Sequence, residues 1–523
     1  MTEQSGTGLR HADPAQGGGS RLAGNRLGIA GIVFFVVAAA APLVGMTGAV
    51  PIAIVLGNGA GVPGAYLVVG VILLVFSVGY SAMSHRVTNT GAFFAYVGRG
   101  LGVVPGVGSA FVSLLAYLTI QLAIFGFFGA VMAGHMDAEL GINLAWWVWA
   151  LIAWALVLAL SALSVDVGAK VLGVLMILEV LSLAVVAVAV LFSGGGPDGM
   201  ALGSSFSPGN VFEGGFAGSA GIALTFAFAS YIGFEATAIY GEETRDPKRS
   251  VPIATYIAVS LIAVLFAFTS WAVVSGLGSD AVRDRVAEIS AVEGTPLADP
   301  AAVLFGVADE YVGGWLATVM SWLVLSSLFA GLLAFQNSAA RYFFSMARAG
   351  VLPSVLGRVN GRGAPVFGTA AVAATSLLVI VLFRITDRDP VVHMFTWFSA
   401  LAVLSIVVVE VLVSIAVIAY FRRPGNAGSE DTGPESTGNV WSTLVAPVVA
   451  IVGLVLGIYL LVSRFGLLAG TAAEGVDPAT QSWGLSALGW FLVALPFLVL
   501  AAGMAVGALR RGKKTEAMAD LVS

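Results

Sequence analysis

Three glutamates, Glu179, Glu235 and Glu410, fall deep inside long apolar stretches of the 523-residue chain. A carboxylate at the centre of a bilayer costs roughly 2.5–3.5 kcal/mol on insertion scales, so such residues usually face the interior of a helical bundle or a water path. Burial favours the neutral form of a carboxyl group, so each of these residues could bind a proton from one side and release it to the other. These three residues therefore indicate proton transfer within a membrane.

Helix-breaking residues interrupt two of the apolar stretches near their middles: Pro42 with two following glycines in the first stretch, and Gly233 in the sixth. Unpaired backbone N–H and C=O groups cost several kcal/mol each in lipid, so protein, water or a ligand must satisfy them. A lone interruption usually marks only a kink or a close helix contact, but two at corresponding positions predict a midplane binding site. The candidate substrate-binding residues at these interruptions are Ala41, Pro42, Leu43, Val44, Gly45, Thr47, Gly48, Ser230, Tyr231, Ile232 and Gly233.

The elements that must position these residues are transmembrane helices. Hydrophobic residues make up 58% of the chain and charged residues 10%, whereas soluble proteins carry about 45–50% and 25%. This composition excludes a water-soluble enzyme. The net charge of −5 argues against a nucleic-acid partner, and the absence of cysteine excludes disulfides and thiolate catalysis.

Cofactor and metal chemistry have no supporting pattern in the sequence. The four histidines lie at or beyond the ends of the apolar stretches, without metal-ligand spacing, and no GxxxxGK[ST] loop occurs. No nucleophile and base are spaced for catalysis. We therefore predict no cofactor, no metal and no enzymatic activity.

Twelve apolar runs have the length of about 20 residues that a membrane-spanning helix needs. They cover residues 27–57, 62–83, 105–133, 144–164, 168–192, 217–240, 251–277, 312–346, 366–384, 391–421, 441–464 and 484–509. The two interrupted spans open two groups of five, and an odd number of spans per group forces the second group to enter the membrane inverted. The sequence thus predicts an all-α integral membrane protein with a 5+5 inverted repeat and two additional C-terminal helices.

The predicted organisation follows from these runs. We expect a disordered cytoplasmic tail at 1–26 and two repeats of five spans at 27–192 and 217–421. A final helix pair at 441–509 and a second cytoplasmic tail at 510–523 follow. All but five of the 24 lysines and arginines then fall on the side of the chain termini. Because cytoplasmic loops are enriched in positive charge, both termini are predicted to be cytoplasmic in a multi-pass cell-membrane protein. The charged stretches 278–311 and 424–439 are expected to form an outer loop, with a short helix, and an inner linker.

Three segments carry a family resemblance. Residues 233–252, GFEATAIYGEETRDPKRSVP, resemble the "GFE…EE…NP-R-IP" signature of the amino acid–polyamine–organocation permeases. Residues 337–365, NSAARYFFSMARAGVLPSVLGRVNGRGAP, resemble the "N…R…F-MARDG-LP" signature of the same family. Residues 38–51, AAAAPLVGMTGAVP, are similar to its opening segment but lack the Gly-Ser-Gly type triplet of many members. The resemblance implies the leucine-transporter-like fold and secondary transport of amino acids or related amines.

The resemblance also suggests roles for individual residues. Proton-coupled members of the family carry a lysine on span five, and Glu179 aligns with it, so the sign of the charge is reversed here. Glu235 matches the glutamate of the "GFE" signature and is predicted, with Glu179 and Phe228, to act in gating or proton coupling. Tyr117 and Gln121, four residues apart on one helix face, could line the cavity. Glu410 has no motif around it and is expected to be a packing residue.

Charged residues on the cytoplasmic side of spans six and eight could close an inner gate through ion pairs. These residues are Glu242, Glu243, Arg245, Arg341 and Arg348. The leading hypothesis is a permease that moves amino acids across the membrane by alternating access, with proton coupling or exchange, and with a small-molecule substrate and the lipid bilayer as its partners. Alternatives are a carrier of polyamines or other organic cations, or a sodium symporter using Ser326 and Ser327. A channel would need rings of polar residues, and a membrane-embedded enzyme would need a catalytic constellation. The sequence shows neither.

Overall fold

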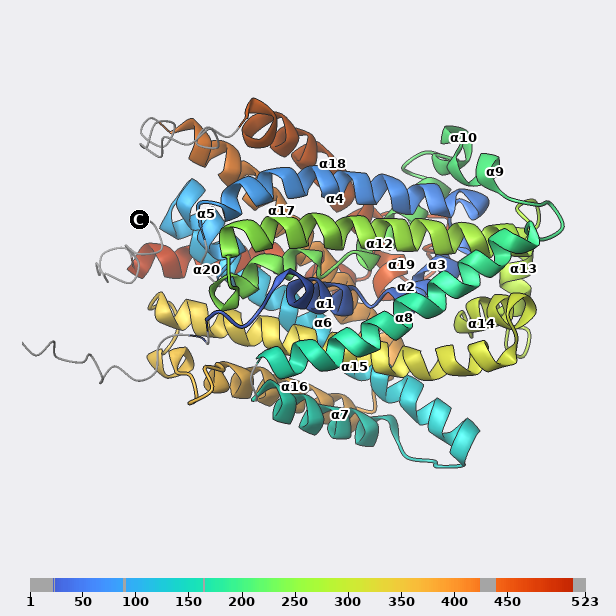
Figure 1. Ribbon diagram of the computed structural model, residues 1–523, viewed down its shortest axis with the longest axis horizontal. Coiled ribbons are helices and arrows are strands. Elements are labelled where there is room, and N and C mark those ends of the chain that lie inside the picture. The colour runs from blue at the N-terminus through green and yellow to red at the C-terminus, as the bar shows by residue number, and fades with distance from the viewer. Residues whose placement is uncertain (1–21, 23, 88–90, 163–164, 424–438, 511–523) are drawn as a thin grey trace, which may run out of the picture.

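The computed structural model describes residues 22, 24–87, 91–162, 165–423 and 439–510. Long helices run side by side along the longest axis of the molecule (Figure 1). Within the described residues the remaining elements are short helices, turns and four isolated backbone bridges, with no extended strand. This arrangement confirms the predicted all-α class.

The helices, in chain order, are α1 (Ile29–Ala40), α2 (Pro42–Thr47), α3 (Ala49–Leu56), η1 (Gly59–Gly61), α4 (Val62–Ser84), α5 (Phe93–Leu101), α6 (Val103–Leu140), α7 (Trp146–Ser161), α8 (Val165–Ser193), α9 (Leu202–Phe206), α10 (Pro208–Val211), α11 (Ser219–Ser230), η2 (Phe234–Glu243), α12 (Pro247–Leu277), α13 (Val282–Ile289), α14 (Ala301–Tyr311), α15 (Gly314–Arg348), η3 (Ser354–Gly357), α16 (Val366–Ile385), η4 (Pro390–Phe395), α17 (Thr396–Arg422), η5 (Trp441–Val445), α18 (Ala446–Ser463), α19 (Phe465–Ala469) and α20 (Ala487–Arg510).

Eleven helical stretches of the described chain are long and apolar enough to cross a membrane, and the shorter apolar helix α7 supplies the twelfth span. The span count predicted from the sequence is therefore confirmed. The observed boundaries differ from the predicted ones mainly at the ends of the spans. Span six, for example, continues as the 3-10 helix η2 to Glu243. All of the predicted linker at 424–439 except Asn439, and most of the two predicted tails, lie outside the described residues.

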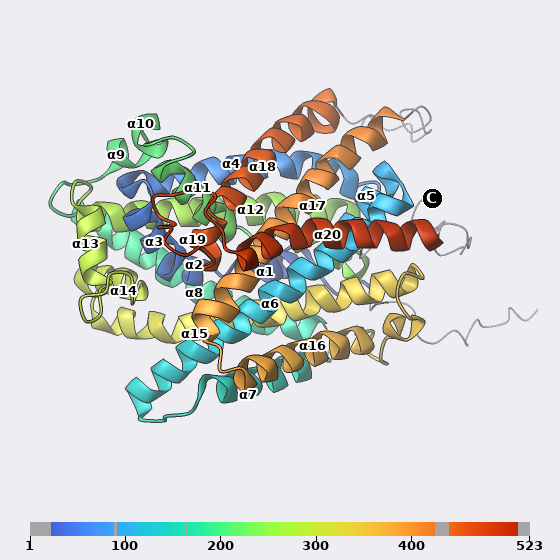
Figure 2. The same ribbon diagram turned by 180° about the vertical axis from the view of Figure 1, so that it is seen from behind.

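Two connections are more structured than the sequence indicates. The segment 278–311, predicted to be an outer loop, contains two helices, α13 and α14, where one short helix is expected. A further helix, α5, lies between the second and third spans. Figures 1 and 2 show α9, α10, α13 and α14 at one end of the bundle, with α5 and the C-terminal end of α20 at the other. We call the end with α5 and the C-terminal end of α20 the terminal end, and the end with α9, α10, α13 and α14 the opposite end.

Glycines allow several helices to approach at backbone distance, as is common in membrane bundles. A Cβ at Gly100 of α5 would lie 2.2 Å from the carbonyl oxygen of Ala416 on α17. A Cβ at Gly503 of α20 would lie 2.9 Å from the Cα of Gly108 on α6. These contacts leave no room for larger residues, so they fix the spacing of α5, α6, α17 and α20.

We predict that Gly100→Ala destabilises the protein by about 1–3 kcal/mol, because the added methyl group overpacks a backbone contact. The measurement is the thermal melting temperature of the detergent-solubilised protein. Gly98→Ala on the same helix is the control, since a Cβ there meets nothing within 4 Å. Equal melting temperatures for the two variants would contradict the close α5–α17 packing.

Candidate functional site

The first interruption separates α1 from α2 at Ala41. This alanine has φ 44°, in the left-handed region that alanine rarely occupies, and Pro42 begins the next helix. Pro42 has no N–H to donate to the carbonyl of Ala38, and the N–H of Leu43 donates to Glu179 Oε1 at 2.6 Å. The carbonyl groups of Ala38 and Ala39, in the last turn of α1, therefore lose their regular helical donors.

The second interruption lies between α11 and η2, where Gly233 adopts φ 109°. A Cβ at Gly233 would lie 2.7 Å from the Cβ of Ala39, so only glycine fits and the two interruptions touch each other. The N–H of Gly233 donates to Glu235 Oε2 at 2.8 Å. Each interruption thus has a backbone N–H that donates to a glutamate of the chain itself.

The two interrupted spans lie side by side and run in opposite directions. On the terminal side Ala39 meets Gly233, Phe35 stacks on Tyr240 at 4.7 Å, and the Leu27 N–H donates to the Glu243 carbonyl. On the opposite side α3 packs against α11. Both interruptions therefore sit at one depth in the bundle, as the sequence predicts.

Glu179 connects three elements around the first interruption. It is 2% exposed on α8, and its Oε1 accepts hydrogen bonds from Leu43 of α2 and, at 2.9 Å, from the hydroxyl of Ser327 on α15. Both donors stabilise the ionised form of the carboxyl group. Glu179 therefore lies at the interruption in span one, with partners that no sequence pattern indicates.

Glu235 is fully buried at the second interruption. Besides Gly233, the hydroxyl of Tyr117 on α6 donates to Glu235 Oε1 at 3.0 Å. The hydroxyl of Tyr80 on α4 donates to the Glu235 backbone carbonyl at 2.7 Å and accepts from the N–H of Ala238. Tyr117 is among the residues singled out from the sequence, whereas Tyr80 carries no such signal.

Other predicted site residues have partners away from the interruptions. Gln121 donates to Gln336 of α15, which in turn donates to the Thr369 carbonyl. The ring of Phe228 lies against α18, because a Cβ at Gly457 would lie 2.9 Å from it. The gating role of Phe228 stays a prediction, but its ring does not cover the interruption.

Ser230 and Tyr231 face the second span of the chain. The hydroxyl of Tyr231 donates to the Tyr66 carbonyl at 2.8 Å, and the hydroxyls of Tyr66 and Ser230 are 3.0 Å apart. Gly45 fits beneath the ring of Phe266, where a Cβ would come within 2.6 Å. No sequence pattern indicates Tyr66, because residues far apart in the chain meet here.

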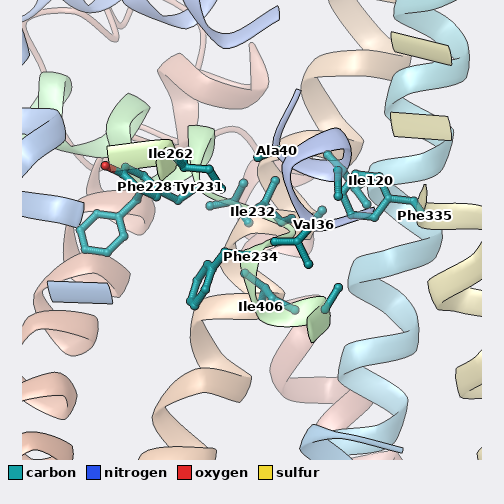
Figure 3. Packing of buried hydrophobic residues seen from close by; sticks show 14 of the residues in the cluster. Val36, Ala40, Ile120, Phe228, Tyr231, Ile232, Phe234, Ile262, Phe335 and Ile406 are labelled. Atoms are coloured by element: carbon teal, nitrogen blue, oxygen red, sulfur yellow. The ribbon is translucent and has the colours of Figure 1, made fainter. Parts of the chain in front are cut away.

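The side chains around the interruptions are mainly apolar. Figure 3 shows Val36 and Ala40 of α1, Ile232 beside them, and Ile120 with Phe335 on the facing helices. All five are less than 9% exposed. The polar groups that converge on this apolar region are backbone groups, tyrosine and serine hydroxyls and the two glutamates.

The predicted ion pairs are present at the terminal end of the two spans. Glu243 Oε1 and Oε2 accept from Arg341 Nη2 at 2.9 Å and Nε at 2.5 Å, and both side chains are 2% exposed. Glu242 pairs with Arg348 at 2.7 Å, with side chains 22% and 33% exposed. Arg245 contributes its backbone N–H to the Leu27 carbonyl. A role of these residues as a gate remains a prediction.

Comparison with known proteins identifies the family of the chain. The family model described as amino acid permease matches residues 31–500. The chain belongs to the amino acid permease family. This match, together with the helix count, confirms the expected twelve-span leucine-transporter-like fold.

Individual permeases from bacteria and fungi are similar to this permease. It is 25% identical to the branched-chain amino acid permease BcaP of Lactococcus lactis over 72% of this chain and 77% of that protein. It is 22% identical to the amino-acid permease GAP5 of Candida albicans, covering 72% of this chain and 62% of that protein. It is 26% identical to the putrescine transporter PotE of Haemophilus influenzae, covering 45% of this chain and 48% of that protein.

We predict that Arg341→Ala destabilises the permease by about 3–5 kcal/mol, because it leaves the buried Glu243 carboxylate without a partner. Arg348→Ala should cost roughly 0–1 kcal/mol, since its pair is partly solvated. The measurement is thermal unfolding in detergent. A double variant, Arg341→Met with Glu243→Leu, should recover most of the loss, and failure to do so would contradict the charge argument.

Proposed function

We propose that this permease is a secondary active transporter that moves amino acids across the cell membrane by alternating access. The two interruptions would bind the substrate, with both chain termini in the cytoplasm. The observation that carries the proposal is the meeting of two interrupted, antiparallel spans at Ala39 and Gly233 within an amino acid permease fold.

The backbone at the interruptions suits a zwitterion. The Ala38 and Ala39 carbonyls lie in the last turn of α1, which carries a partial negative charge, and could accept hydrogen bonds from a substrate ammonium group. The N–H groups of Leu43 and Gly233 already hold carboxylate oxygens, those of Glu179 and Glu235. A substrate carboxylate has the same chemistry and could take either position when the glutamate withdraws.

Glu179 and Glu235 would link this binding to protons. Hydrogen bonds to an ionised carboxylate are about twice as strong as bonds between neutral groups. Protonation of Glu179 would therefore weaken its contacts with Leu43 and Ser327 and loosen the interruption from α15. Proton uptake would therefore alter the same contacts that substrate binding must change.

The inner gate would consist of the Glu243–Arg341 and Glu242–Arg348 pairs, with Arg245 at the Leu27 contact. These pairs join η2 to α15, and the Leu27 contact joins η2 and the following turn to the residues just before α1. Release of a substrate toward the terminal end would require them to separate. The partly solvated pair would open at the lower cost.

Transport of polyamines is the second candidate, favoured by the similarity to the putrescine transporter. Buried carboxylates suit a cationic substrate, but the surroundings of the interruptions are otherwise apolar (Figure 3). Sodium coupling is a further alternative. The Ser327 hydroxyl donates to Glu179, and the Ser326 hydroxyl donates to the Leu323 carbonyl in its own helix.

The deciding experiment is counterflow in proteoliposomes loaded with one unlabelled solute and supplied with its labelled form outside. Leucine is compared with isopentylamine, which lacks the carboxylate, and with putrescine. We expect counterflow with an amino acid and none with isopentylamine. Counterflow of putrescine alone would replace the amino acid proposal with the polyamine alternative.

We predict that Glu179→Gln makes uptake much less dependent on pH, because the amide cannot take up or release the proton. The measurement is initial uptake in proteoliposomes at a series of pH values, with and without an imposed sodium gradient. Ser182→Ala on the same helix is the matched control, since it removes a hydroxyl that donates to the Glu179 backbone carbonyl and leaves the carboxyl group in place. An unchanged pH profile in Glu179→Gln would remove Glu179 from proton coupling, and stimulation by sodium would favour the symporter alternative.

A further inference from the structure

Arg283 of α13 is a charged side chain that the transport mechanism proposed above does not use. Its Nη2 group donates to the Gly57 carbonyl at 2.9 Å and to Glu213 Oε2 at 2.7 Å. Gly57 directly follows α3, which is the opposite-end half of span one. Glu213 precedes α11, which is the opposite-end half of span six. One guanidinium group therefore bridges the corresponding ends of the two interrupted spans.

Glu213 is firmly connected to the start of α11. Its backbone carbonyl accepts from the Ala220 N–H at 2.9 Å and from the Ser219 hydroxyl at 2.8 Å. Both donors lie in the first turn of α11, so a displacement of Glu213 is passed on to that helix. The contact between Arg283 and Glu213 consequently acts on span six itself.

The end of span one leaves space for the Arg283 side chain. Gly59 adopts φ 58°, and a Cβ there would lie 2.7 Å from Arg283 Nε, so this position requires glycine for two reasons. Val282 and Val286 of α13 are buried, and α13 packs against α3 at the opposite end of the bundle (Figures 1 and 2). The guanidinium group is thus presented by an anchored helix.

Next to this bridge the two half-helices touch directly. A Cβ at Gly57 would lie 3.1 Å from the Cβ of Ala223 on α11, and the Asn58 side-chain N–H donates to the Val211 carbonyl at 2.8 Å. Ala53, one turn before Gly57 on the same face of α3, is fully buried. A solute that enters between α3 and α11 from the opposite end therefore requires these helices to separate.

We propose that Arg283 is the clasp that controls entry between α3 and α11 from the opposite end of the bundle. The proposal rests on the transport function proposed above. With the clasp in place, α13 holds the ends of both interrupted spans together. When Arg283 releases Glu213 and Gly57, α3 and α11 separate at a lower cost. Arg283 is a positioning residue, since it acts on the interruptions through the helices that it joins.

The strength of the clasp suits a contact that opens in every transport cycle. The Arg283 and Glu213 side chains are 42% and 50% exposed, so their attraction is weak and is screened by salt. Both side chains of the Arg341–Glu243 pair at the terminal end are 2% exposed. The contact at the opposite end is therefore the easier one to open, and its opening depends on ionic strength.

The test takes advantage of the absence of cysteine from the chain. Ala53→Cys introduces a single reporter thiol on α3, and its rate of labelling by a maleimide is measured in the purified protein without substrate. We expect Arg283→Gln to raise this rate about two- to fivefold, the range that an exposed ion pair allows. Glu213→Gln should raise it as well. Arg285→Gln, which changes an exposed side chain two residues further along α13, should leave it unchanged.

Salt gives a readout that a general loosening of the fold would not change. Raising sodium chloride from about 50 mM to about 500 mM should speed labelling of the parent reporter protein and of Arg285→Gln, but not of Arg283→Gln, because salt screens only a pair that is present. Labelling is measured well below the melting temperature of each variant, so unfolding does not contribute.

Equal labelling rates of Arg283→Gln and Arg285→Gln, or a salt response retained in Arg283→Gln, would overturn the proposal. Failure of every amino acid in parent counterflow would instead overturn the transport function. Labelling needs no substrate, so it would still decide whether Arg283 controls the separation of α3 and α11.

Discussion

The requirement that backbone polar groups be satisfied within lipid governs this structure. Two spans stop being helical in the middle of the bundle, at Ala41 and at Gly233, and each exposes N–H groups there. The chain satisfies them with two of its own buried carboxyl groups, Glu179 and Glu235. An interruption that would be too costly alone is therefore stable, and the groups that stabilise it are ones that can change charge.

The ends of the same spans are held differently. At the terminal end a buried, two-contact Arg341–Glu243 pair joins η2 to α15. At the opposite end Arg283 of α13 contacts the Gly57 carbonyl, just beyond α3, and the exposed Glu213. A solvent-exposed ion pair contributes little to stability, whereas removing one partner of the buried pair is strongly destabilising. The terminal end of these two spans is thus held together by the stronger contact.

Sequence patterns were sufficient for features that depend on local chemistry. Pro42 and Gly233 marked the interruptions because each imposes a backbone conformation wherever it occurs, and apolar run length indicated the spans. Partners contributed by distant spans were not accessible in the same way. A helical period does not specify which neighbour a face meets, so the contacts of Glu179 with Ser327 and of Glu235 with Tyr80 had no signal. The same limit explains why the contact of Phe228 with α18 had no signal in the sequence.

The contact between Gly233 and Ala39 has a mechanical consequence. With no space for even a methyl group between them, neither half-helix can rotate or slide at this crossing without pushing the other. The two half-helices must therefore move together at this crossing. Any rocking of span one would thereby be transmitted to span six through the Ala39 methyl group and the Gly233 backbone, without a long, flexible side chain to absorb the movement.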